Sequence, residues 1–175
     1  MGIYTKTGDK GETGLFDKSK RLPKYSLEIE TLGTIDEANS FLGLSASFLT
    51  EQYLKNKVTQ VQKNLFTLAS IIAGAKLSIP KSVVTKYEKE IDEWTAMMPP
   101  LSSFIYPGGG KPAAFLFTAR TVARRAERLI VKLNEEKRLN STILIYINRV
   151  SDYLFTLARY VNFREGVKEE VWSRE

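Results

Sequence analysis

Residues 58–75 read VTQVQKNLFTLASIIAGA, and this stretch decides the fold class. Its apolar residues follow one another in steps of three and four positions: Val58, Val61, Leu65, Leu68, Ile72 and Ala75. Because an α-helix turns once in about 3.6 residues, this spacing places their side chains on one face. A single apolar stripe of this kind is typical of a helix in a bundle.

Comparable apolar periods occur on both sides of this stretch. They predict a first helix over about residues 27–49, a short third helix over 84–94, a fourth over 112–134 and a fifth over 144–161. Pro80 separates the second segment from the third, and Pro99 and Pro100 end the third, because proline has no N–H and clashes inside a helix. No two segments show the alternation that is typical of paired strands. We therefore expect an all-α, five-helix, up-and-down bundle.

The chain of 175 residues suits a single domain. We divide it into an N-terminal loop (1–24), a helical bundle (25–165) and a C-terminal tail (166–175). The loop holds four of the eleven glycines, with Thr and Lys between them, which indicates an ordered loop and neither helix nor strand. A second irregular segment, PPLSSFIYPGGGKP, spans residues 99–112. Irregular segments of this kind often carry function.

Cysteine and histidine are both absent from the chain. Their absence excludes a disulfide framework and a thiol nucleophile. It also excludes zinc sites built on Cys or His and any Ser-His-Asp triad. An enzyme with this composition needs chemistry without a proton shuttle that titrates near neutral pH. Phosphoryl or alkyl transfer to a ready-made nucleophile meets that condition.

No apolar run approaches the roughly 18 residues of a transmembrane helix. The first ten residues, MGIYTKTGDK, lack the apolar centre of a signal peptide. We therefore expect a cytoplasmic protein with no membrane partner.

The predicted fourth helix carries a stripe of arginines, made up of Arg120, Arg124, Arg125 and Arg128. At about 100° per residue this stripe is separate from the apolar face of the same helix. Residues 107–130 contain five basic side chains and a single acid, Glu127. The net charge of +6 also favours anionic ligands.

Three interpretations of this stripe remain open. It forms a solvated helix face with ion pairs, it pairs with an acid on another helix such as Asp36 or Asp152, or it binds a ligand. A triphosphate suits guanidinium groups well, because each can donate two hydrogen bonds to it.

Five motifs, taken together and in this order, carry a family resemblance. They are YTKTGDKGETGLF at 4–16, LGTIDEANS at 32–40, FIYPGGG at 104–110, ARTVARRAER at 119–128 and INRVSDYLFTLAR at 147–159. With them the chain resembles the ATP:corrinoid adenosyltransferases of the propanediol-utilisation type. The match covers nearly the whole chain.

The resemblance implies a ferritin-like bundle that assembles as a homotrimer, with active sites at the subunit interfaces. The residues that it implies as ATP contacts are Thr5, Lys6, Thr7, Gly8, Thr13, Gly14, Lys24, Arg124, Arg125, Glu127, Arg128 and Asn148. It implies an intersubunit salt bridge between Asp36 and Arg120, and we count this pair and Arg124 as the catalytic residues. It places Phe104 below the corrin ring. It implies no protein metal ligand.

The implied reaction moves the 5′-deoxyadenosyl group of ATP onto the cobalt of a reduced corrinoid, cob(I)alamin, and releases triphosphate. ATP, with Mg²⁺, and the corrinoid are the implied small molecules; a reductase and an adenosylcobalamin-dependent mutase are the implied protein partners. Two other functions stay open. A non-catalytic nucleotide sensor would bind ATP without turnover. A basic helical nucleic-acid-binding protein would use the same arginines on backbone phosphates, although we find no nucleic-acid motif and expect no such partner.

Overall fold

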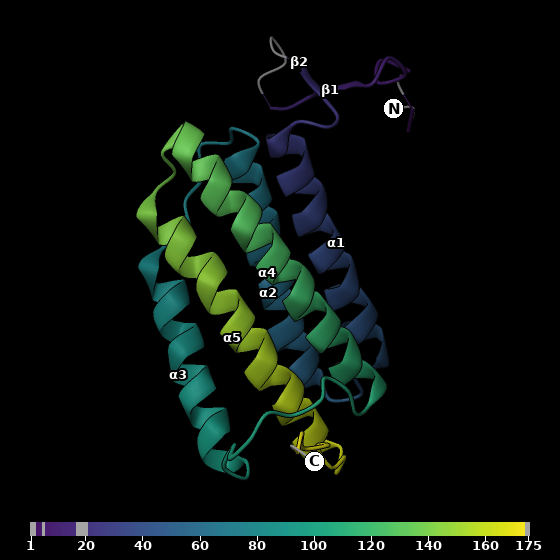
Figure 1. Cartoon of the computed structure of the whole chain (residues 1–175), viewed down its shortest axis with the longest axis vertical. Helices are drawn as coiled ribbons and strands as arrows, with labels where there is room; N and C mark the ends of the chain where they lie inside the picture. Colours follow the sequence, from purple (N-terminus) through teal and green to yellow (C-terminus); the bar gives the residue numbers. More distant parts are fainter. Residues whose placement is uncertain (1–2, 5, 17–20, 174–175) are drawn as a thin grey trace.

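The computed structural model describes residues 3–4, 6–16 and 21–173. Within them five helices form one bundle in which consecutive helices run in opposite directions (Figure 1). The helices are α1 (Leu27–Phe48), α2 (Gln52–Ile72), α3 (Lys81–Met97), α4 (Lys111–Lys137) and α5 (Ser141–Arg164). The predicted five-helix, up-and-down bundle is confirmed.

The core lies between the apolar stripes of these helices. Helix α1 packs against α2 and α4, and α5 packs against α3 and α4. The stripe of α2 is buried from Val58 to Ile72 as its spacing predicts. Ala75 is an exception, because α2 ends at Ile72 and Gly74 takes a left-handed φ of 100°. That expected member of the stripe lies in the connection to α3.

A short antiparallel ladder precedes the bundle, so the expectation of no strand pair is wrong. Strand β1 (Glu12–Gly14) pairs with β2 (Arg21–Pro23), with Thr13 opposite Leu22. The Arg21 guanidinium donates to the carbonyls of Thr7 (2.7 Å) and Glu12 (3.0 Å). Strands of three residues have no room for an apolar alternation, and side-chain-to-backbone bonds such as these leave no periodic signal in the sequence.

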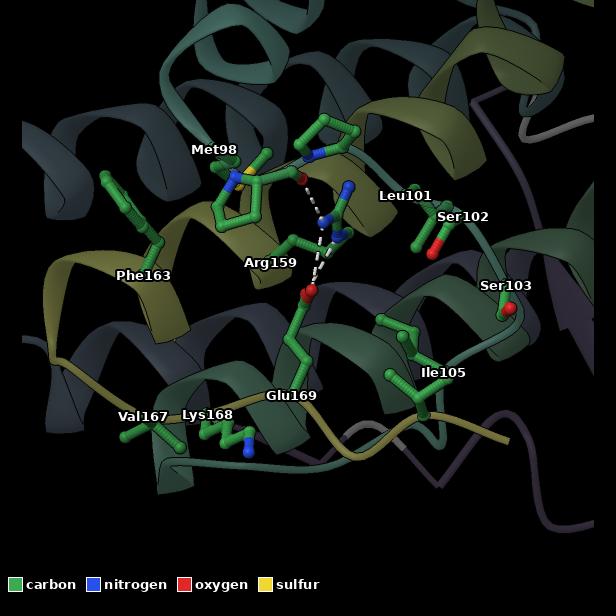
Figure 2. Close-up of a pocket in the computed structure, with 13 residues that line it drawn as sticks. Met98, Leu101, Ser102, Ser103, Ile105, Arg159, Phe163, Val167, Lys168 and Glu169 are labelled. Carbon is green, nitrogen blue, oxygen red and sulfur yellow. Dashed lines mark hydrogen bonds and ion pairs between the residues drawn. The ribbon is translucent and has the colours of Figure 1, made fainter. Parts of the chain in front are cut away.

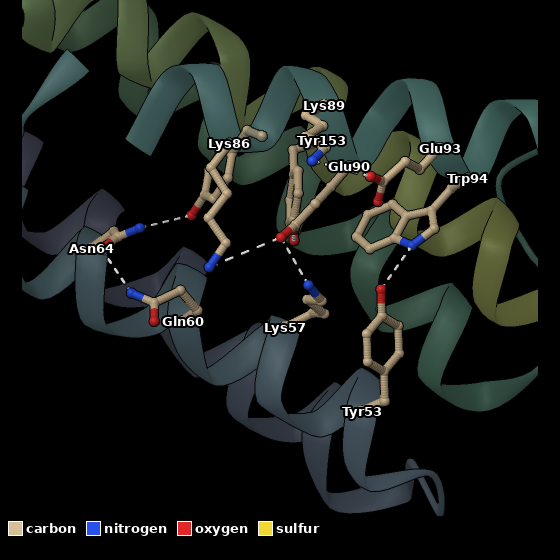
Figure 3. A network of polar contacts seen from close by, with 11 residues as sticks. Tyr53, Lys57, Gln60, Asn64, Lys86, Lys89, Glu90, Glu93, Trp94 and Tyr153 are labelled. Carbon is tan, nitrogen blue, oxygen red and sulfur yellow. Dashed lines mark hydrogen bonds and ion pairs between the residues drawn. The ribbon is translucent and has the colours of Figure 1, made fainter. Parts of the chain in front are cut away.

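A buried polar cluster fastens α3 to α2 and α5 (Figure 3). Glu90 of α3, only 6% exposed, accepts hydrogen bonds from the Lys57 ammonium (2.8 Å) and the Tyr153 hydroxyl (2.5 Å). Burial, and then the hydrogen bond to Glu90, raise the pKa of Tyr153, so its phenol stays a donor. The ring of Tyr87 stacks on that of Tyr153 with centroids 4.0 Å apart. These contacts satisfy the buried carboxylate and fix the position of α3.

The C-terminal tail turns back across the connection between α3 and α4. Residues Ile105 and Val171 form an antiparallel bridge there. The amide of Tyr106 donates to the carbonyl of Glu170, and that of Trp172 donates to the carbonyl of Phe104, both at 2.8 Å. In the described part of the chain, no helix has both the length and the apolar character that crossing a lipid bilayer requires.

Candidate functional site

Helices α4 and α5 form a polar pocket from residues that the sequence had singled out. Arg124, Glu127, Arg128 and Val131 of α4 line it together with Asn148 of α5, and its volume is about 380 Å³. The Asn148 amide donates to the Glu127 carboxylate at 2.9 Å. One Arg128 nitrogen donates to the Arg124 carbonyl at 3.0 Å. The structure therefore brings together four of the predicted ATP contacts.

The positions of these side chains follow from helix geometry. Residues 127 and 128 lie three and four positions after 124 and four and three before 131, so the four form one continuous strip along α4. The buried alanines of the same helix, such as Ala123 and Ala126, allow α4 to lie close to its neighbours. Two guanidinium groups beside one amide and one carboxylate make a pocket suited to an anion with several oxygen acceptors.

Arg125 points elsewhere. It forms an ion pair with Glu37 of α1, and both side chains are about half exposed. The structure thus realises the interpretation in which an arginine of the stripe pairs with an acid on another helix, although the acid is neither Asp36 nor Asp152. Asp152 instead pairs with Arg149 on its own helix at 2.7 Å.

Arg120 lies one turn before Arg124 and is half-buried. Among the described residues its Nε atom is buried without a hydrogen-bond partner. Its guanidinium carbon lies 5.8 Å from the centre of the Phe155 ring. Burial, and then the positive charge of Arg124, lower the pKa of Arg120. A buried Nε without an acceptor is unfavourable, so an anion from outside the chain would stabilise Arg120 at this position.

Asp36 is exposed on α1. Within the residues that the structure describes, the ion pairs of one chain do not include an Asp36–Arg120 pair. The prediction that the two residues pair between subunits is therefore untested by a single chain and stays a prediction.

The N-terminal loop is a hairpin held by local contacts. Lys6 and Gly11 have positive φ angles of 58° and 81°, and the amide of Lys24 donates to the carbonyl of Gly11 at 2.9 Å. The Lys24 ammonium lies 3.3 Å from the point where a Cβ atom on Gly8 would be. The loop therefore places Gly8 beside a positive charge, which favours an anion there.

The described residues of this hairpin do not line the α4 pocket of their own chain. All the described residues around that pocket come from α4 and α5. Figure 1 shows the hairpin beyond the N-terminal end of α1, past the end of the bundle. The structure thus separates Lys6, Thr7, Gly8, Thr13, Gly14 and Lys24 from the other predicted ATP contacts. Thr5 lies outside the described residues.

Phe104 lies at the opposite end of the bundle, in the connection between α3 and α4. Its side chain is 81% exposed, and its ring meets that of Trp172 edge-on with centroids 6.5 Å apart. A large aromatic side chain so exposed is available to a flat apolar ligand or to another chain. The structure thus gives Phe104 the accessibility that its predicted role needs.

A neighbouring pocket of about 280 Å³ is lined by this connection, the end of α5 and the C-terminal tail (Figure 2). At its centre lies Arg159, which the sequence analysis did not select and which is only 5% exposed. Arg159 donates to both carboxylate oxygens of Glu169, at 2.7 and 2.9 Å, and to the carbonyl of Pro99 at 3.2 Å. Its position at the end of the fifth motif was the one available signal. Its partners, ten and sixty residues away, were not predictable from spacing.

The described residues contain no group of three or more Asp, Glu, His or Cys side chains placed to hold a metal ion. The α4 pocket can still bind Mg²⁺ together with a polyphosphate, because Mg²⁺ keeps water and phosphate oxygens as most of its ligands. The chemistry that this chain offers is therefore anion binding at the α4 pocket, with an exposed aromatic group, Phe104, on the connection that leads into α4.

The sequence of this chain is similar to those of one family of known proteins. A family model described as cobalamin adenosyltransferase matches residues 3–161. A corrinoid adenosyltransferase of Bacillus subtilis is 42% identical over 182 residues, covering 99% of this chain and 93% of that protein. The human corrinoid adenosyltransferase is 36% identical over 187 residues, covering 98% of this chain and 73% of that protein.

Solved structures show the same fold. A variant of a PduO-type ATP:corrinoid adenosyltransferase from Lactobacillus reuteri, solved with cobalamin and ATP, superposes with a TM-score of 0.93. It is 35% identical, and the match covers 99% of this chain and 97% of that chain. A second variant of the PduO-type enzyme from that organism, solved with ATP, gives a TM-score of 0.91 at 36% identity.

Proposed function

This chain belongs to the cobalamin adenosyltransferase family, and from that premise we propose that it transfers the 5′-deoxyadenosyl group of ATP to the cobalt of a reduced corrinoid. The cobalt(I) centre attacks C5′ of ATP, a cobalt–carbon bond forms, and the C5′–oxygen bond breaks. The leaving triphosphate keeps the electron pair of that bond, and the cobalt is formally oxidised by two electrons. The observation that carries the proposal is the pocket of Arg124, Glu127, Arg128 and Asn148 in a chain of this family.

The arginines stabilise the triphosphate leaving group. Negative charge accumulates on the triphosphate as the C5′–oxygen bond breaks, and fixed guanidinium donors stabilise that charge. In our proposal Arg124 and Arg128 bind phosphate oxygens, while Asn148 orients Glu127 within the pocket. Cobalt(I) is already a strong nucleophile, so no protein base is needed, in agreement with a chain that lacks His and Cys. The cofactor supplies the bond-making chemistry, and the protein supplies orientation.

We also propose that the site is completed by a second copy of the chain in a homotrimer. The N-terminal hairpin of one chain would cover the α4 pocket of its neighbour and bring Thr5, Lys6, Thr7, Gly8, Thr13, Gly14 and Lys24 to ATP. Large apolar side chains in and beside the hairpin are exposed in one chain, which favours such a contact: Ile3, Tyr4, Phe16 and Tyr25. The unpartnered Nε of Arg120 favours pairing with Asp36 of the neighbour.

Phe104 serves the corrinoid in this proposal. An apolar side chain without a lone pair, placed below the corrin ring, excludes an axial ligand from the lower face of cobalt. Four-coordinate Co(II) accepts an electron more readily than five-coordinate Co(II), so exclusion helps a reductase to produce Co(I). Mg²⁺ would enter with the ATP phosphates, which supply most of its ligands. The reductase, the mutase that receives the product and the cytoplasmic location stay predictions.

An anaerobic assay with chemically reduced cobalamin and ATP tests the reaction. The expected product is adenosylcobalamin, identified by its absorbance spectrum and its loss on exposure to light, with one triphosphate released for each product. ATP binding without product would instead assign the chain as a nucleotide sensor. Sedimentation or native mass spectrometry of the same sample tests the trimer independently of turnover.

A further inference from the structure

The last turns of α5 hold the glycine-rich turn that starts α4. Asn162 is only 2% exposed, and its side-chain amide bonds to the turn on both sides. Its Nδ2 donates to the carbonyl of Gly108, and its Oδ1 accepts from the amide of Gly110, each at 3.0 Å. One buried side chain therefore satisfies a donor and an acceptor that lie two residues apart in the turn.

The turn and the amide fit each other closely. Gly109, between the two bonded residues, has a φ of 106°, which L side chains rarely adopt. A Cβ atom there would lie 2.3 Å from Oδ1 of Asn162, too close for any side chain. Gly110 is the N-cap residue of α4 and has no side chain of its own with which to cap the helix. Asn162, on a different helix, instead accepts from the Gly110 amide itself, one of the N–H groups at the start of α4 that have no partner within the helix.

This clamp lies between two parts of the proposed site. Phe104 is six residues before Gly110, and Arg120 is ten residues after it on the rigid helix α4. A second clamp, Arg159, lies one helical turn earlier on α5 and holds Pro99 and Glu169. The end of α5 thus fixes both ends of the segment 99–110 that carries Phe104.

We propose that Asn162 is a positioning residue for the corrinoid side of the site. It fixes the position at which the Phe104 segment ends and α4 begins. It thereby sets the distance from the lower face of the corrin ring to the ATP pocket. This inference rests on the proposed function. Asn162 is buried and does not line the α4 pocket, so its loss should disturb corrinoid use and leave ATP binding in place.

The test compares Asn162→Ala and Asn162→Leu with Asn140→Ala. Asn140 caps α5 at the other end of the bundle by accepting from the Thr142 amide at 2.9 Å, so its loss also removes one helix cap. Leu keeps the size of Asn162 and adds no charge, but it can neither donate to Gly108 nor accept from Gly110. It therefore serves as the second variant if Asn162→Ala does not fold.

Both Asn162 variants should lower kcat/KM for cobalamin by about tenfold or more, because both lose the two buried hydrogen bonds that hold the turn in position. The KM for ATP should stay within about twofold of wild type, since uniform loss of binding is not expected. The spectroscopic signal of four-coordinate Co(II) bound to the protein should weaken. The rate of amide hydrogen exchange over residues 104–114 should rise. Asn140→Ala should change none of the first three readouts.

Asn162 variants that match Asn140→Ala in corrinoid kinetics and in the Co(II) signal would overturn the inference. Equal increases in the KM values for ATP and for cobalamin would also overturn it, because they would reveal general loosening of the bundle. A wild-type chain that forms no product overturns the proposed function, and the inference with it. An active wild type with unaffected Asn162 variants overturns the inference alone.

Discussion

The α4 pocket and the Phe104 segment differ in how far a single chain completes them. At the pocket, Arg124, Arg128 and Asn148 already lie together on two rigid helices. At the other end, Phe104 is 81% exposed on a connection held by backbone bonds to the C-terminal tail. The first region is specified by spacing along helices, and the second depends on contacts between distant residues and on what binds there. Substitutions should therefore separate ATP effects from corrinoid effects.

The largest expected effect concerns how strongly the pocket end also depends on a second chain. Arg120, beside Arg124, is the point at which that dependence is expected. Asp36→Asn should weaken the trimer by roughly 3–5 kcal/mol, because it would leave the guanidinium of Arg120 buried and unpaired at the interface. Sedimentation over a range of protein concentrations measures this effect. Arg120→Ala should weaken assembly as well.

Asp92→Asn is the matched control for Asp36→Asn, since Asp92 is an exposed acid on α3. It should leave assembly unchanged. If trimer stability is the same in wild type, Asp36→Asn and Arg120→Ala, the intersubunit pair does not exist and Arg120 does not tie the pocket end to a second chain.

Arg124→Ala tests the pocket itself. Loss of a charge-assisted bond to the developing triphosphate should cost on the order of 2–4 kcal/mol, so turnover should fall by about two orders of magnitude or more. Steady-state kinetics at saturating ATP measures it, with the trimer checked by sedimentation. Arg124→Lys should recover only part of the loss, because an ammonium group cannot donate as a planar fork.

Arg149→Ala is the control for Arg124→Ala. Arg149 pairs with Glu88 (3.1 Å) and Asp152 (2.7 Å) on the α3–α5 surface, away from the pocket. Its loss should leave turnover near the wild-type value. Wild-type turnover in Arg124→Ala would instead remove this arginine from the reaction.

Phe104→Ala sharpens the comparison from the corrinoid end. ATP binding and trimer assembly should persist, while the four-coordinate Co(II) signal is lost. Turnover should fall by about tenfold or more, a change of roughly 1.4 kcal/mol in the barrier, when Co(II) has to be reduced in the site. The fall should be smaller when chemically prepared Co(I) is supplied. Phe66→Ala, which removes another exposed phenylalanine on α2, should change neither signal nor turnover.

The same contrast explains what the sequence could predict. Apolar spacing specified all five helices, and the spacing of Arg124, Glu127 and Arg128 placed them on one strip of α4. Helix geometry is local, so it can be calculated from the order of residues. The family resemblance, not spacing, added Asn148 to that group.

Long-range contacts were beyond that reasoning. The hairpin of β1 and β2 depends on Arg21 reaching two carbonyls, and no apolar period records it. Asn162 meets Gly110 from 52 positions away, and Arg159 meets Pro99 from 60. Polar side chains that bond to a distant backbone carry no signal in the intervening sequence, which is why the Phe104 end was predicted less completely than the pocket.

The smallest effect is expected at Arg125, and it tests where the pocket ends. Arg125 was predicted to contact ATP, but in one chain it is paired with Glu37 of α1 and lies outside the pocket lining. To bind a phosphate it has to give up that ion pair, so the net gain is small. Exposed ion pairs contribute about 0–1 kcal/mol, so Arg125→Ala should raise the KM for ATP by no more than about fivefold.

Glu37→Gln is the informative partner variant. It frees Arg125 without removing its charge, so the KM for ATP should stay level or fall slightly. Steady-state kinetics with ATP varied at saturating cobalamin measures both variants. A loss in Arg125→Ala as large as that in Arg124→Ala would contradict this ranking and would extend the pocket across the α1–α4 groove.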